Sequence, residues 1–259
     1  MKSSSYQSGF TLLELLVVLV VLVSLITLAS PAIQRSLRAG QAGASMSNLR
    51  QLVTANLAYA ADNDGRFSPA QSPDNLIRWH GARASGSSAF DPTKGFLSPY
   101  LGKSNRVSTC PLFKDHISDG SSWELGTGGY GYNAIYIGGT YNNNFTPERA
   151  VNISNPTQTV MFSTTAFAKS DGLQEYPYSE PFRWVDPNGN LAGPLQPSTH
   201  FRANGKAIIA WCDGHVTQER PNSESGPNYY GGDNRDSEIG WFGPSTNNGF
   251  WNPKQSFGP

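Results

Sequence analysis

The sequence predicts an α+β protein in which one long N-terminal helix, with a membrane half and an amphipathic half, packs against a small antiparallel β-sheet head with long loops. Three observations support this prediction. An apolar stretch fills residues 10–30, a helical pattern follows it to about residue 61, and short β-rich segments separated by turns fill the rest. The 27 glycines and 18 prolines indicate many loops, while 13 Phe, 11 Tyr and 6 Trp indicate a packed core rather than disorder.

The apolar stretch is long enough to cross a bilayer. Sixteen of the twenty residues from Phe10 to Ala29 are apolar, and twenty helical residues cover about 30 Å, the thickness of the hydrocarbon layer. A buried core helix is the alternative, but this run is apolar on every side rather than along one stripe. We therefore expect a single-pass anchor. An ordinary secretory signal is excluded because Lys2 is the only charge before it and no small-residue cleavage site follows it.

Glu14 is the one charged residue in this stretch. A carboxylate at the centre of a membrane helix costs about 2.5–3.5 kcal/mol, and less near the interface. Such a residue predicts a function with a cationic partner. The alternative is that the Glu14 side chain reaches the membrane interface and does nothing else.

The sequence GFTLLE at residues 9–14, followed by LVVLVV, resembles the class III signal of type IV pilins and type II secretion pseudopilins. The resemblance implies that a prepilin peptidase cleaves between Gly9 and Phe10 and N-methylates Phe10, and that Glu14 acts in assembly. It also implies that Pro31 kinks the helix. The Phe10 amine and Glu14 lie four residues apart, on the same side of one helix. In a filament we expect Glu14 of an arriving subunit to pair with the Phe10 amine of a neighbour.

The resemblance also implies the domain organisation and the location. Residues 1–9 are a leader peptide, 10–30 a transmembrane and filament-core helix, 31–64 the amphipathic half of the same helix, and 65–259 a loop-rich β head. The implied location is the inner membrane, single-pass, with the head in the periplasm or in an extracellular filament. The implied partners are prepilin peptidase, other pilin or pseudopilin subunits and the inner membrane. Nineteen basic residues balance nineteen acidic ones, so we expect no nucleic-acid partner.

Beyond Pro31 the apolar residues recur every three or four positions and form one stripe on which a head can pack. The stripe comprises Ile33, Leu37, Ala44, Leu49, Leu52, Val53, Leu57 and Ala60. The sequence DNDG at residues 62–65 ends the helix, because Gly65 suits the left-handed conformation of a helix cap.

The head contains several β-rich segments bounded by turn residues. The predicted strands are Leu76–Trp79, Arg106–Cys110, Tyr130–Ile137, Thr159–Ser163, Phe182–Val185, Lys206–Cys212 and His215–Gln218. The last two form the clearest hairpin, across a two-residue turn at Asp213-Gly214. In that register Ile209, Trp211 and Val216 share a face, which we place against the helix. From Pro221 onward we expect ordered loop with little regular structure.

Further segments resemble one group of pilin-like proteins with a His-to-Asp-Gly signature near the C-terminus. They are Tyr59–Gly65, Cys110–Pro111, Tyr130–Asn133 and Asp213–Val216. His200 precedes Asp213 by more residues than that signature usually has, so the roles of His200 and His215 stay open.

Few residues suggest chemistry in the head. We expect a disulfide between Cys110 and Cys212, because each ends a predicted strand and an extracytoplasmic head would keep it oxidised. An oxygen-rich loop at residues 233–238, with Asp233, Asn234, Asp236 and Glu238, is a weak calcium candidate, and a solvated polar loop is the favoured alternative. The sequence contains no H-E-x-x-H, G-x-S-x-G or phosphate-binding loop, so we expect neither an enzyme nor a cofactor.

The expected function is therefore structural: a subunit of a type II secretion pseudopilus or a type IV pilus-like fibre. The alternative is a membrane-anchored or tip-located binding module for polysaccharide or an exported substrate. Five aromatic residues of the tail are candidates either for a sugar-stacking surface or for packing. They are Tyr229, Tyr230, Trp241, Phe242 and Trp251.

Overall fold

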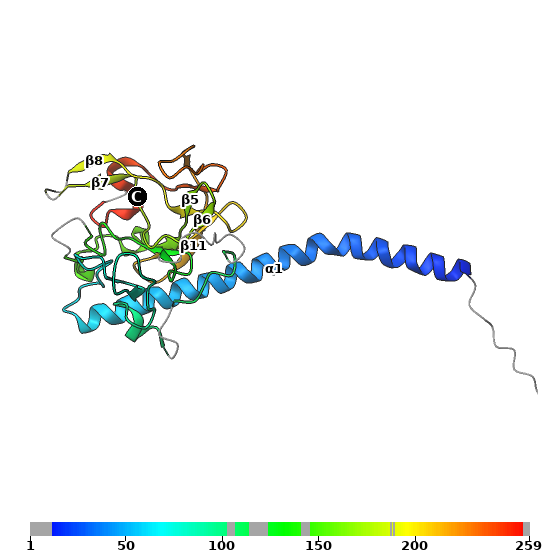
Figure 1. The fold of residues 1–259 in the computed structure, drawn as a ribbon, viewed down its shortest axis with the longest axis horizontal. Helices are drawn as coiled ribbons and strands as arrows, with labels where there is room; N and C mark the ends of the chain where they lie inside the picture. Colours follow the sequence, from blue (N-terminus) through cyan, green and yellow to red (C-terminus); the bar gives the residue numbers. More distant parts are fainter. Residues whose placement is uncertain are drawn as a thin grey trace, which may run out of the picture. The chain divides into compact units, whose positions relative to one another are not determined.

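The computed structural model describes residues 12–102, 107–113, 124–140, 146–186, 188 and 190–255. Helix α1 spans Leu12–Asp62 without interruption (Figure 1), which confirms the predicted long helix over the described residues. The chain divides into two compact units, residues 1–40 and residues 41–259, and α1 contributes to both. Pro31 lies inside the helix and does not end it.

The predicted stop after α1 is confirmed. Asp64 and Gly65 both have left-handed backbones, with φ of +53° and +74°. The N–H groups of Asn63 and Gly65 donate to the carbonyl of Ala60 at 3.2 and 2.9 Å. A glycine in this conformation closes the last turn and satisfies a carbonyl that the helix leaves unpaired.

The head is built of small antiparallel sheets. A four-stranded sheet has the order β11-β10-β4-β3, a three-stranded sheet the order β12-β13-β9, and β1-β2, β5-β6 and β7-β8 are pairs. The strands are β1 Ile77–Arg78, β2 Gly81–Ala82, β3 Tyr130–Tyr132, β4 Val160–Thr164, β5 Phe167–Lys169, β6 Gly172–Gln174, β7 Arg183–Val185, β8 Leu191–Pro194, β9 Thr199–His200, β10 Ala207–Trp211, β11 Val216–Glu219, β12 Ser223–Glu224 and β13 Ile239–Trp241. Short 3₁₀ segments are η1 Ser98–Tyr100, η6 Ala150–Asn152, η7 Pro156–Gln158 and η8 Thr246–Trp251.

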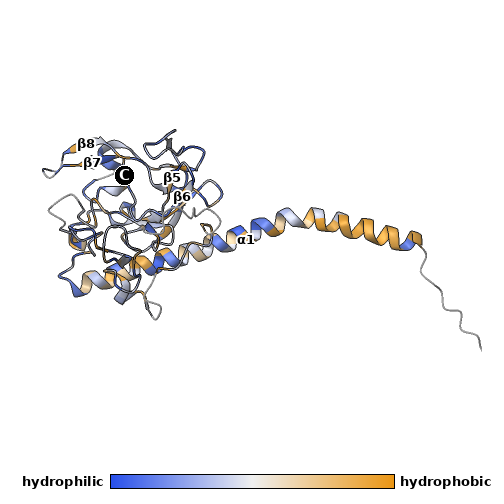
Figure 2. Ribbon diagram, viewed as in Figure 1, coloured by the Kyte–Doolittle hydropathy of each residue, from blue (hydrophilic) through white to orange (hydrophobic). Residues whose placement is uncertain are grey.

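The C-terminal half of α1 packs on one face of the four-stranded sheet. A row of side chains crosses that sheet, because Val216 pairs with Ala210, Ala210 with Phe162, and Phe162 with Tyr132. These four residues belong to the same buried cluster as Leu49, Leu52 and Val53 of α1. Figure 2 shows the change along the helix, from hydrophobic in its first part to mixed in its second. The predicted packing of helix on sheet is confirmed.

The buried stripe differs from the predicted one. Ile33 and Leu37 are 57% and 63% exposed and Leu57 is 39% exposed, while Ala44 is also exposed. The buried helix positions are instead Ala42, Ser45, Leu49, Leu52, Val53, Ala55, Asn56 and Ala60. The first buried helix residue is Ala42, next to Gln41, where the second unit begins. The packing includes two polar residues that an apolar pattern overlooks, since Ser45 contacts the hydroxyl of Tyr130 and Asn56 accepts from the N–H of Ser68.

The predicted register of the β10–β11 hairpin is wrong by one residue. The Trp211 N–H donates to the carbonyl of His215 at 3.0 Å, so the loop has three residues, 212–214, instead of two. Gly214 occupies its positive-φ position at +96°, as three-residue hairpin loops require. A slip of one residue turns every side chain to the other face. Ile209 and Trp211 therefore face away from the helix cluster, whereas Val216 belongs to it.

The C-terminal tail forms a layer on the second face of the four-stranded sheet. Ile209 and Trp211 pack there with Phe242 and Trp251, and the last two are 1% and 0% exposed. As expected, the tail beyond Pro221 has little regular structure, but it contains the short strands β12 and β13. Their pairing partners are far apart in sequence, Ser223 with Trp241 and β13 with β9, so no local alternation indicates them.

The other predicted strands are shorter than expected, shifted by one residue or absent. Residues 107–110 form no strand, and Arg106 lies outside the described residues. β3 ends at Tyr132 because Asn133 turns the chain: its carbonyl accepts from the N–H groups of Ile137 and Gly138 at 3.1 and 3.0 Å. The predicted strands near residues 77, 183 and 207 are confirmed with shorter bounds, and those near residues 160 and 216 are confirmed with the same length, shifted by one residue.

Candidate functional site

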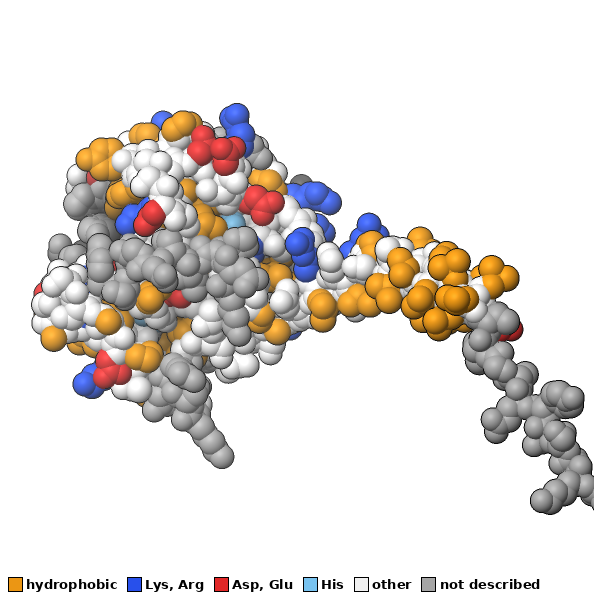
Figure 3. Space-filling view, turned by 45° about the vertical axis from the view of Figure 1, so that its right-hand side comes forward, with side chains coloured by type: hydrophobic (Ala, Val, Ile, Leu, Met, Phe, Trp, Pro, Cys, Tyr) orange, Lys and Arg blue, Asp and Glu red, His pale blue; other side chains and the backbone are white. Residues whose placement is uncertain are grey.

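The N-terminal part of α1 is apolar on every side. Its large aliphatic side chains are all well exposed, from 48% for Val18 to 88% for Leu12. Figure 3 shows hydrophobic side chains gathered over this part of the helix. Within the described residues, α1 is long and apolar enough to cross a membrane. The segment is therefore suited to a bilayer, or to the apolar core of a helical bundle.

The neutral polar residues in this segment bond within the helix. The Ser24 hydroxyl donates to the carbonyl of Val20 at 2.8 Å, and the Thr27 hydroxyl donates to the carbonyl of Ser24 at 2.9 Å. Such local bonds pair the hydroxyl donors inside the helix, so these groups can enter an apolar environment without an unsatisfied hydrogen-bond donor. Glu14 lies in the first turn and is exposed, where the helix dipole favours a negative charge. Gly9 and Phe10 lie outside the described residues, so cleavage between them stays a prediction.

Pro31 removes one hydrogen bond from α1. A proline lacks an N–H, so the carbonyl of Thr27 has no partner at the usual spacing of four residues. The helix nevertheless continues to Asp62. A kink at Pro31 stays a prediction.

The predicted disulfide is not formed, since Cys110 and Cys212 are both free and buried. The Cys110 thiol donates to the Ser45 hydroxyl at 3.4 Å, on the side of the core next to α1. Cys212 lies in the β10–β11 loop, where its N–H donates to the carbonyl of Thr159 at 2.9 Å. Burial raises the pKa of the Cys212 thiol, so it stays protonated and acts as a small core side chain.

The weak calcium candidates form a loop closed by its own hydrogen bonds. Asp233 accepts from the N–H groups of Arg235 and Asp236 at 2.8 and 3.3 Å. Asn234 is 1% exposed and donates to the Ser225 hydroxyl at 2.7 Å. Among the residues that the structure describes, no three His, Cys, Asp or Glu side chains are grouped to hold a metal ion. These are the contacts of a polar loop, and calcium binding by Asp233, Asp236 and Glu238 stays a prediction.

The three histidines that the structure describes, His80, His200 and His215, lie on separate segments. His215 contacts Asp213 at 2.6 Å and stacks on Trp211 in the hairpin. His200 is buried in β9 and meets the ring of Phe113 edge-on. Burial lowers the pKa of the fully enclosed His80, so its ring is neutral. The structure therefore brings no pair of these rings together for acid–base chemistry.

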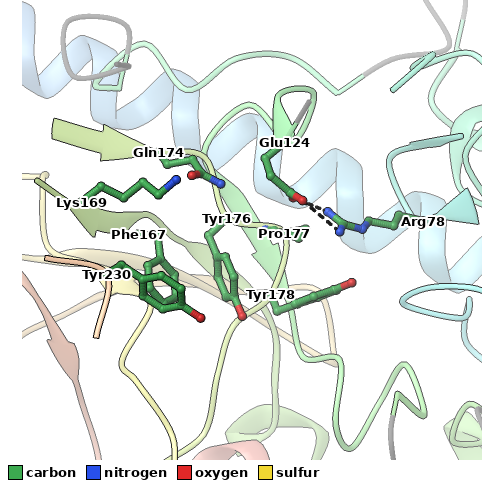
Figure 4. Close-up of a pocket in the computed structure, with 9 residues that line it drawn as sticks. All are labelled: Arg78, Glu124, Phe167, Lys169, Gln174, Tyr176, Pro177, Tyr178 and Tyr230. Carbon is green, nitrogen blue, oxygen red and sulfur yellow. Dashed lines mark hydrogen bonds and ion pairs between the residues drawn. The ribbon is translucent and has the colours of Figure 1, made fainter. Parts of the chain in front are cut away.

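A pocket of about 170 Å³ lies elsewhere in the head, and no sequence motif marks it. Figure 4 shows its aromatic and polar side chains. They are Arg78, Glu124, Phe167, Lys169, Gln174, Tyr176, Pro177, Tyr178 and Tyr230. Of the five tail aromatics, only Tyr230 lines it. The nine residues are spread from Arg78 to Tyr230, so a search for local patterns does not find them.

Comparison with known proteins gives one match. A family model described as the prokaryotic N-terminal methylation motif matches residues 4–30, the segment that contains Gly9, Phe10 and Glu14. No curated protein and no solved structure matches the chain.

Proposed function

We propose that this chain, with its prepilin-type N-terminal methylation motif and long apolar helix, is a structural subunit of a type II secretion pseudopilus or a type IV pilus-like fibre. Prepilin peptidase removes residues 1–9 and methylates Phe10. The mature subunit is anchored in the inner membrane until it is assembled into the fibre. The observation that supports this proposal is the match over residues 4–30, together with the exposed large aliphatic side chains of α1 from Leu12 to Leu28.

The apolar half of α1 suits both environments that such a subunit meets. In the membrane its aliphatic side chains contact lipid, and in a fibre they contact the same segment of neighbouring copies. Moving between two apolar environments costs little, and close packing between helices then supplies the attraction. Ser24 and Thr27 do not oppose either state, because their hydroxyl groups already bond within the helix.

Glu14 gives this non-directional packing a fixed axial register. A methylated amine on Phe10 stays cationic, and the Glu14 carboxylate of an arriving subunit pairs with it. The attraction offsets part of the penalty for burying either charge. A wrong register leaves both charges buried and unpaired, which is strongly unfavourable.

The head performs no bond-making or bond-breaking in this proposal. Its sheet is held to the C-terminal half of α1 by the cluster that contains Leu49, Leu52 and Val53. A head fixed in this way faces the periplasm or the fibre surface, according to the state of the subunit. In this proposal the head has a structural role.

The test compares Glu14→Leu with Ser24→Leu, each expressed in the native host. Both variants replace a polar residue of the same helical segment by leucine, but only the first removes the charge. We expect Glu14→Leu to be inserted and cleaved normally while its assembled amount falls at least tenfold, measured in sheared filaments for a pilus or by cross-linking between subunits in the envelope for a pseudopilus. Ser24→Leu should assemble like the wild type. Normal assembly of cleaved Glu14→Leu would refute the proposed role.

A second readout separates the two kinds of fibre. A pilus subunit is recovered mainly from filaments sheared off the cell surface. A pseudopilus subunit stays with the cell envelope, and deleting its gene stops the export of a folded substrate. Presence in neither fraction, with the processed protein only in dispersed membranes, would contradict assembly into any fibre.

A further inference from the structure

The pocket in the head has the size of one six-membered ring. Its volume is about 170 Å³, and an engineered protein cavity of 150 Å³ is known to hold benzene. Strands β5 and β6 supply Phe167, Lys169 and Gln174, and the chain after β6 supplies Tyr176 and its two neighbours. A ligand that fits here is a single ring, or one ring at the end of a longer chain.

Four aromatic rings form the apolar side of the pocket. The Phe167 ring lies 4.7 Å from that of Tyr176 and 4.6 Å from that of Tyr230, and Tyr176 lies 5.6 Å from Tyr178. Tyr230 is 50% exposed, so part of its ring is open to a ligand. Phe167 and Tyr178 are 8% and 7% exposed, so Tyr230 provides the open stacking face and the other rings support it from the core.

Tyr230 is held on a well-fixed turn. The Asn228 side chain accepts from the N–H of Tyr230 at 2.9 Å, and Gly231 bridges to Lys169 of β5. Gly232 packs so closely that a Cβ there would lie 2.5 Å from the backbone of Ala168. The half-exposed ring is therefore preorganised, which reduces the entropy lost on binding.

Polar side chains lie beside the aromatic surface (Figure 4). Arg78 and Glu124 form an ion pair with Nη1 and Oε2 2.5 Å apart, and their side chains are only 5% and 12% exposed. Gln174 is 8% exposed, and its Oε1 makes no hydrogen bond to the residues that the structure describes. A buried acceptor without a donor is unfavourable, and a ligand hydroxyl would satisfy it.

The charge of the lining excludes one common ligand of aromatic pockets. Among the lining residues that the structure describes, Arg78 and Lys169 are cationic and Glu124 is anionic, so positive charges outnumber negative ones in that set. Aromatic cages that bind quaternary ammonium groups use the negative faces of their rings to attract a cation. A positive pocket repels such a ligand and accepts a neutral or weakly acidic one.

We propose that this pocket binds one pyranose residue of a polysaccharide. A pyranose has an apolar C–H face, which stacks on a ring such as Tyr230, and a rim of hydroxyl groups. Those hydroxyl groups bond to the Gln174 amide and the Arg78–Glu124 pair. The proposal does not depend on fibre assembly, because every lining residue belongs to the head.

The test measures binding by the full-length chain in detergent micelles. The probes are cellotetraose, chitotetraose, mannotetraose and tetragalacturonate, titrated by calorimetry. We expect at least one to bind and Tyr230→Ala to weaken that binding at least tenfold. Tyr229→Ala is the matched control, because Tyr229 is 89% exposed and does not line the pocket. It should change the affinity less than threefold.

A second variant tests the polar side independently. Gln174→Met keeps the length of the side chain and removes the amide, and we expect at least fivefold weaker binding with an unchanged melting temperature. Absence of binding to all four probes would overturn the proposal, as would equal affinity of the wild type and Tyr230→Ala. Binding that Tyr229→Ala weakens as strongly as Tyr230→Ala would also overturn it, since the site would then be the exposed surface.

Discussion

Ser45 of α1 and Tyr130 of β3 hydrogen-bond through their hydroxyl groups at 3.1 Å, in a buried contact between helix and sheet. Asn48 donates to the same Tyr130 hydroxyl, also at 3.1 Å. Burial raises the pKa of Tyr130, so the group stays neutral. A polar contact of this kind has directional geometry, and it fixes the rotation of α1 against the sheet more sharply than apolar packing alone.

Removing this contact should destabilise the head. Tyr130→Phe leaves the side chains of Ser45 and Asn48 without their common partner, and we expect a loss of about 1–3 kcal/mol in the free energy of unfolding. Urea denaturation of the full chain in micelles, followed by tryptophan fluorescence, measures it. Tyr229→Phe on the surface should change stability by less than about 0.5 kcal/mol. Equal stability of the two variants would show that the contact contributes nothing.

The apolar contact between α1 and the sheet has its own matched pair. Leu52 is 1% exposed and Leu57, one turn further on, is 39% exposed. Leu52→Ala removes a buried side chain and leaves a cavity, so we expect a loss of about 2–5 kcal/mol. Leu57→Ala should cost much less. The same urea titration ranks the two, and the reverse order would contradict the packing described here.

Replacing two strand glycines by alanine should have different effects on the melting temperature. A Cβ on Gly131 of β3 would lie 2.5 Å from the Thr165 side chain and 2.6 Å from the backbone of Tyr178, whereas one on Gly193 of β8 meets nothing within 4 Å. We expect Gly131→Ala to lower the melting temperature by several degrees, since a contact with backbone forces the strand to move. Gly193→Ala should leave it unchanged or raised. Similar melting curves for both would argue against the close approach at β3.

Glu180 predicts a dependence of stability on pH. Burial raises its pKa to about 7, although the Tyr176 hydroxyl donates to its Oε1 at 2.8 Å. Because the folded state holds this proton more tightly than the unfolded state, the contribution is complete below about pH 4.5 and is lost as the pH rises through 7. Glu180→Gln should flatten the decline in unfolding free energy between pH 5 and pH 8. An identical decline in the variant would assign it to other groups.

The features predictable from sequence were those with a local pattern. The continuous apolar run, the DNDG stop at residues 62–65 and the β-rich run of β10 each lie within one short segment. The helix positions at Ser45 and Asn56 could not be predicted as buried, because their polar side chains are satisfied by Tyr130 and Ser68 from distant segments. The hairpin register failed because Asp-Gly serves two-residue and three-residue loops alike.

The same distinction between local and non-local signals applies to the candidate sites. Gly9, Phe10 and Glu14 are recognisable because the signal is contiguous. The head pocket was missed because Arg78, Glu124 and Tyr230 meet only through the fold. The disulfide prediction failed because it placed Cys110 at the end of a strand, whereas residues 107–110 form no strand. Cys110 lies near Ser45, while Cys212 bonds to the backbone of Thr159.

The most direct test of the central claim is the intact mass and N-terminal sequence of the protein purified from membranes of its native host. Processing at the methylation motif predicts a chain that begins at Phe10, lacks residues 1–9 and has one added methyl group on its N-terminal amine. The same sample from a strain without prepilin peptidase should begin at Met1. A chain that keeps Met1 in the presence of the peptidase, or that is cleaved after the apolar segment, would contradict the account.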